Sequence, residues 1–132
     1  DFHRVSALFH DMPIRRMSRL TQRLMQSIDY EHAVQRRIDN YNTLRAAFGG
    51  RELKYGEVPM IFPYNSAEGQ ELRKHLIANK IFVAKYWPNV DEWTEEDSTE
   101  RWMANHILPL PIDQRYDKED MNRIINTIKD YE

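Results

Sequence analysis

The chain has 132 residues, of which 41% are hydrophobic, and its formal net charge is −2. This length is enough for one domain that folds alone, and the composition argues against wholesale disorder. The absence of cysteine excludes disulfides, thiol nucleophiles and cysteine metal ligands. Because no apolar run approaches the roughly 18 residues of a membrane span and no signal peptide is visible, we expect a cytoplasmic protein.

Charge is distributed unevenly along the chain. Residues 1–51 hold nine Arg, no Lys and five acids, whereas residues 52–132 hold ten Lys and Arg and sixteen acids. Such asymmetry can mark a nucleic-acid face, but a duplex-binding domain is usually more basic overall. We therefore expect neither a nucleic acid nor a membrane as a partner.

A lead-in over residues 1–12 precedes a helical pattern that begins at Pro13, a residue favoured in the first turn of a helix. Asp29 favours caps over helix interiors, so the phase breaks just before it. A second apolar stripe then runs to Phe48, where Gly49-Gly50 stops it. The pattern predicts a long helix or a helix pair, and the first stripe recurs at three- and four-residue steps: Ile14, Met17, Leu20, Leu24 and Ile28.

The middle of the chain predicts two extended segments with a helix between them. Residues 58–64 are apolar but punctuated by prolines, which indicates an edge strand or an extended stretch. Asn65 or Ser66 caps the next helix, which ends near residues 79–80. Residues 81–87 are rich in β-branched and aromatic side chains and predict a strand.

The last third predicts a loop, a short helix, an extended stretch and a final helix. Residues 89–97 are acidic and indicate a loop, and Asp97 or Ser98 caps the short helix. The prolines of residues 107–112 discourage helix in the residues before them. Asp117 then caps an amphipathic helix. The predicted fold class is α+β, with a small, mostly antiparallel sheet covered by helices. The apolar face of the last helix comprises Met121, Ile124, Ile125 and Ile128.

Residue chemistry alone does not identify an activity. No two histidines have metal-ligand spacing, so we expect no metal, and a packing role for His106 is favoured by roughly four to one over a pocket role. The sequence has neither a Gly-x-Ser-x-Gly elbow nor a glycine-rich phosphate loop. Lys85 is the one lysine in an apolar run, although strand alternation leaves its direction open. Four aromatic residues line a cleft or pack in the core: Tyr86, Trp87, Trp93 and Trp102.

The order of several short motifs along the chain is more informative than any single residue. Arg16-Met17-Ser18 opens a long helix that leads to Arg36-Arg37, and later come Lys80-Ile81, Tyr86-Trp87-Pro88 and a Leu-Pro stretch before Asp117. In order and spacing, residues 13–132 resemble the C-terminal small domain of pyridoxal-phosphate-dependent, fold-type I aminotransferases of the DegT/DnrJ/StrS family.

This resemblance implies a homodimer with active sites at the subunit interface. The family transfers an amino group, commonly from glutamate, to a keto sugar of nucleotide-sugar metabolism or a related carbonyl substrate. The lysine that holds pyridoxal phosphate lies upstream of the Arg-Met-Ser motif, so the resemblance implies no catalytic residue and no bound cofactor in this segment alone. It places Arg16 near the partner's cofactor, and Tyr86 and Trp87 in the substrate pocket.

The chain also departs from the family pattern. Ile14 stands where a phosphate-contacting Asn is usual, Arg15 stands in place of Tyr, Lys80 replaces a turn glycine, and Tyr86-Trp87 replaces His-Tyr. These departures indicate a divergent branch. The alternative hypothesis is a free-standing α+β protein-interaction module without catalysis.

Overall fold

A computed structural model describes residues 2–9 and 12–132 of the chain. The fold class is α+β, as predicted, with a two-stranded antiparallel sheet. Part of the predicted lead-in is helical, while residues 1, 10 and 11 lie outside the described residues. The elements in chain order are α1 (Phe2–Phe9), α2 (Arg19–Gln26), α3 (Tyr30–Phe48), β1 (Ile61–Asn65), α4 (Gly69–Ala78), α5 (Val90–Trp93), α6 (Thr99–His106), β2 (Ile107–Pro111) and α7 (Lys118–Lys129).

Prolines determine how the two strands pair. Pro63 lies opposite Pro109, and Pro111 lies opposite Ile61. Proline has no N–H, so these must be the non-hydrogen-bonded pairs of the ladder, and Phe62 with Leu110 must be a hydrogen-bonded pair. The nitrogens of all three prolines therefore point away from the partner strand, toward the outer edges. A further strand would find donors missing on both edges.

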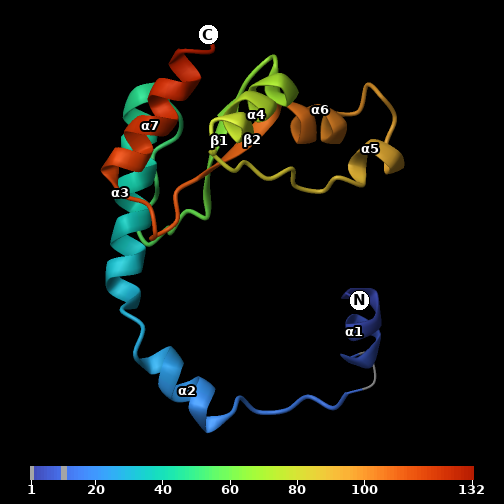
Figure 1. Cartoon of the computed structure of the whole chain (residues 1–132), viewed down its shortest axis with the longest axis vertical. Coiled ribbons are helices and arrows are strands. Elements are labelled where there is room, and N and C mark those ends of the chain that lie inside the picture. The colour runs from blue at the N-terminus through green and yellow to red at the C-terminus, as the bar shows by residue number, and fades with distance from the viewer. Residues whose placement is uncertain (1, 10–11) are drawn as a thin grey trace.

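One hydrophobic core joins the sheet to α3, α4 and α7. The helices α3 and α7 lie side by side, with the sheet and α4 next to them (Figure 1). The predicted apolar face of α7 is buried, as expected for an amphipathic helix whose Asp117 forms a capping box with Asp120. Full burial of each aliphatic side chain contributes roughly 1.5–3 kcal/mol. The core consists of Tyr41, Leu44, Phe62, Leu72, Leu76, Ile81, Val83, Leu108, Leu110, Ile112, Met121, Ile124, Ile125 and Ile128.

A buried amide ties α3 to the connection between β2 and α7. Asn40 is 2% exposed and is the one buried polar residue among the described residues. Its Nδ2 donates to the carbonyl oxygens of Ile112 at 3.3 Å, Asp113 at 3.3 Å and Tyr116 at 3.0 Å. A buried carbonyl without a hydrogen-bond donor destabilises the folded state. By donating to these carbonyls, the Asn40 side chain allows the tight turn of backbone to lie next to the core.

The helix α4 ends in a Schellman motif. The N–H of Lys80 donates to the Ile77 carbonyl at 3.0 Å, and that of Ile81 donates to the Leu76 carbonyl at 2.9 Å. Leu76 and Ile81 are both in the core, which completes the motif. Lys80 has a φ of 64°, a left-handed conformation that glycine adopts without strain.

Four local predictions were wrong. The first predicted helix does not start at Pro13, because Ser18 caps it and α2 begins at Arg19. Neither Asn65 nor Ser66 caps α4, whose N-cap residue is Glu68. Residues 81–87 alternate between buried and exposed at their start but join no ladder, since the proline-bearing edges offer too few donors. The acidic stretch 89–97 is not all loop, because it contains α5. The break before Asp29 was right, and Asp29 caps α3.

The helix α2 extends away from the core. It has no buried residue, and Figure 1 shows it beyond the free end of α3, apart from the packed elements. A capping serine and an apolar stripe are typical of a helix that packs against another surface. No other part of the described chain covers the stripe of α2. We refer to residues 12–28 as the arm.

We expect Asn40→Ala to lower the free energy of unfolding by about 1–3 kcal/mol, because three backbone carbonyls lose their donor. Asn40→Asp should be worse, since it aims a carboxylate at the same carbonyls. Asn42→Ala, on an exposed position of the same helix, is the matched control and should stay within about 0.5 kcal/mol. Urea unfolding measures all three, and equal effects at positions 40 and 42 would contradict this role.

Lys80→Gly should stabilise the fold by about 1 kcal/mol, because glycine relieves the left-handed strain that a Cβ causes. Ala78→Gly, inside α4, should destabilise it by a similar amount, because glycine there only adds conformational freedom to the unfolded chain. Opposite shifts of the thermal midpoint are the expected result. A loss of stability at position 80 would refute the strain argument.

Candidate functional site

An apolar groove lies between the sheet and the α5–α6 segment. Its volume is about 510 Å³, within the range of small-molecule sites. Residues before and within the strands form part of the lining, and α5, α6 and the stretch before α5 form the rest. The residues that matter for its chemistry are Met60, Tyr86, Trp87, Val90, Glu100 and Met103.

The two predicted substrate-side residues lie in this lining. The rings of Tyr86 and Trp87 meet edge to face, with centroids 5.8 Å apart and an interplanar angle of 67°. Trp87 is nevertheless 74% exposed, so most of its ring surface is open to a ligand. A flat aromatic face and a tyrosine hydroxyl together can hold an apolar body that carries a polar group.

Trp87 is held in an unusual backbone conformation. Its φ is 49°, in the left-handed region that bulky residues rarely adopt. The following residue is Pro88, which itself restricts the residue before it. Such strain costs on the order of 1–3 kcal/mol and persists only where the surroundings impose it. Here it turns the chain sharply into α5 and leaves the indole at the groove.

A polar cluster behind the groove holds its walls together. The Nζ of Lys85 donates to the carboxylate of Asp91 and, at 2.9 Å, to Oδ1 of Asn105. Nδ2 of Asn105 donates to Asp91 at 3.3 Å, and Arg101 donates to the Asp91 backbone carbonyl. Asp91 therefore joins α5 to α6 and to the stretch that carries Tyr86. The hydrogen bond from Lys85 is the main cause that lowers the pKa of Asp91, against an opposing effect of burial.

A close backbone approach fixes α6 from its other side. A Cβ on Gly69, the first residue of α4, would lie 2.3 Å from the carbonyl oxygen of Asn105 and 2.9 Å from Cα of His106. Glycine is therefore needed for α4 and α6 to pack at this distance. His106 stacks on Trp102 with centroids 4.9 Å apart, which gives it a packing role.

Arg16 is not part of the groove. It is exposed, and it forms no hydrogen bond or ion pair within residues 2–9 and 12–132. The predicted role of Arg16 lies at a partner's site, which a single chain does not display.

Sequence reasoning missed most of the groove. Met60, Val90, Glu100 and Met103 come from three separate segments, and no motif marks them. The one sequence signal was an apolar side chain within an otherwise polar stretch, such as Val90 in the acidic residues 89–97. Asp91 likewise lies in a stretch that the sequence predicts to be a loop.

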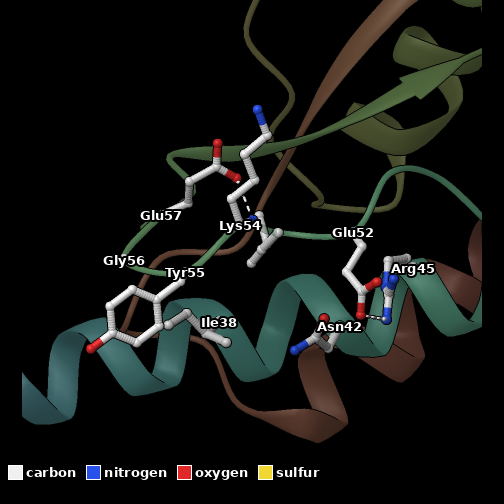
Figure 2. Close-up of a pocket in the computed structure, with 9 residues that line it drawn as sticks. Ile38, Asn42, Arg45, Glu52, Lys54, Tyr55, Gly56 and Glu57 are labelled. Carbon is white, nitrogen blue, oxygen red and sulfur yellow. Dashed lines mark hydrogen bonds and ion pairs between the residues drawn. The ribbon is translucent and has the colours of Figure 1, made fainter.

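A second hollow, of about 390 Å³, lies between α3 and the loop before β1 (Figure 2). Three of its four charged side chains, Arg45, Glu52 and Glu57, are engaged in ion pairs. The carboxylate of Glu57 accepts from Arg51 at 2.7 Å and from the Lys54 backbone N–H at 2.9 Å, and the first of these contacts is the main cause that lowers the pKa of Glu57. Arg45 lies 3.9 Å from Glu52. The pair between Arg45 and Glu52 helps to hold the loop against α3.

Lys85 and Arg16 have different surroundings. Lys85, the lysine in an apolar run, donates to Asp91 and Asn105, whereas Arg16 on the arm forms no hydrogen bond or ion pair within the described residues. In the same residues, no group of three or more His, Asp or Glu side chains is close enough to hold a metal ion.

No helix in the described part of the chain combines the length and the apolar character that crossing a membrane requires. No family model, no curated protein and no solved structure matches the chain.

We expect Asp91→Asn to lower the thermal midpoint at neutral pH, because two partly buried cations, Lys85 and Arg101, lose their counter-charge. The pKa of Asp91 is lower in the folded state, so its contribution is present above the unfolded pKa and is lost as pH falls through the folded pKa. Wild type and variant should therefore converge in acid. Glu92→Gln, on the exposed neighbour, is the control; a pH-independent difference for Asp91→Asn would contradict the linkage.

Proposed function

We propose that the chain is the C-terminal small domain of a cytoplasmic, homodimeric, pyridoxal-phosphate-dependent aminotransferase of the DegT/DnrJ/StrS kind. The observation that carries this proposal is the position of Tyr86 and Trp87. The motif resemblance assigns these two residues to the substrate side, and both line an apolar groove of small-molecule size.

The turn after α4 gives independent support. The motif resemblance aligns Lys80 with a glycine of the family, and Lys80 has a φ of 64°, where glycine is the favoured residue. A correct alignment should place the family's glycine on a left-handed residue, and this one does. The same turn leads directly into the segment that ends at Trp87.

In the proposed enzyme this domain binds and orients the amino acceptor. The Trp87 ring would pack on the acceptor's carbon skeleton, and the groove would keep water from it. Glutamate is the proposed amino donor, and a keto sugar or a related carbonyl compound is the proposed acceptor. The amino-group chemistry belongs to pyridoxal phosphate, which residues outside this chain would hold.

A protein-interaction module without catalysis is the second candidate. The uncovered apolar stripe of α2 favours it, since such stripes normally pack against a partner. The two candidates differ in a simple observable. The natural gene product that contains these residues carries the visible absorbance of bound pyridoxal phosphate under the first proposal and lacks it under the second.

In that gene product, Trp87→Ala should raise the KM for the amino acceptor about tenfold, equivalent to roughly 1.4 kcal/mol of lost binding. The half-reaction with glutamate should be unchanged. Trp93→Ala is the matched control, because Trp93 is 75% exposed, like Trp87, but does not line the groove. Steady-state and single half-reaction kinetics make the comparison. Equal acceptor KM values in both variants would remove Trp87 from the substrate pocket.

A further inference from the structure

The arm presents a helix that cannot be stable through its own contacts. Leu20 is 70% exposed and Leu24 is 59% exposed, on the same face of α2. An isolated helix of eight residues is marginal in water, so a stable α2 needs a surface against which to pack. The apolar stripe is therefore a binding face.

The arm is also strongly basic. Residues 12–28 contain four arginines and no acid: Arg15, Arg16, Arg19 and Arg23. Arg19 and Arg23 lie one turn apart, beside Leu20 and Leu24. The surface that receives this helix should thus be an apolar groove with an acidic margin.

The same chain carries such a groove. Residues 86–100 contain six acids and neither Lys nor Arg, and four residues of this stretch line the groove: Tyr86, Trp87, Val90 and Glu100. Lys85 and Arg101 compensate Asp91, but the other five acids form no ion pair among the described residues. Glu100 lies in the lining itself, beside Met103 and Ala104. The groove thus matches the arm in both apolar character and charge.

We propose that α2 of a second copy docks in this groove, with its leucines on the α6 side and its arginines on the acidic margin. Each copy has one arm and one groove, so a reciprocal exchange closes a two-fold dimer. Within one copy, α2 lies beyond the free end of α3, joined to it by residues 27–29 and away from α5 and α6 (Figure 1). In the proposed enzyme the helix would take the Glu100 and Met103 side of the groove and the acceptor would take the Trp87 side; the docking rests on residues of this chain and not on the catalysis.

Cysteine cross-linking tests this contact directly, since the chain contributes no cysteine. Two differently tagged copies of the full-length protein are co-expressed in a cysteine-free background, one with Leu24→Cys and the other with Met103→Cys. We expect a disulfide between the two tags. Pairing Leu24→Cys with Phe82→Cys, exposed but outside the groove, is the control. No cross-link, equal yields for both pairings, or a link only when both cysteines are in one copy overturns the proposal.

Charge reversal then tests the recognition. Arg19→Glu with Arg23→Glu should lower the cross-link yield on the order of tenfold, and so should Glu96→Arg with Glu100→Arg in the other copy. Combining the two reversals should restore it, and added salt should weaken only the unaltered and doubly reversed pairs. Circular dichroism confirms that each variant folds. Failure of the combined reversal to restore the yield overturns the charge argument, and because no readout uses activity, it leaves the aminotransferase proposal standing.

Discussion

The packing of this chain depends on one side-chain amide, that of Asn40. Its donors satisfy three carbonyls in the tight connection between β2 and α7, which lets α7 return along α3 and bury its apolar face. Without that connection α7 would not close the core that the sheet shares with α3 and α4, and two strands alone are not stable in water. The groove depends on the same frame, because β1 and β2 supply part of its lining.

Local signals in the sequence predicted three of the helix starts but not those of α2 and α4. The caps at Asp29, Ser98 and Asp117 form through backbone groups within three residues, so the residue type alone indicates them. The prediction of a strand at residues 81–87 was wrong, and the reason is not local. The composition of this segment suits a strand, but a strand exists only with a partner, and the pairing depends on prolines more than twenty residues away.

For the groove, too, the sequence points to some residues and not to others. Tyr86 and Trp87 were predicted through motif order, which carries information about residues that are not neighbours. The role of Asp91 could not be predicted, because its partners Lys85, Arg101 and Asn105 come together only when α5 folds against α6. Nor could the matching of arm and groove be predicted, since α2 has the same sequence pattern whether or not the chain covers it.

The outward-facing prolines of the sheet have a consequence for how copies of the chain can stick together. An open two-stranded ribbon is normally a template for edge-to-edge growth into cross-β aggregates. Pro63 on one edge and Pro109 and Pro111 on the other interrupt the row of amide donors that such growth needs. In a crowded solution these prolines therefore disfavour growth of the chain into fibrils through its sheet edges.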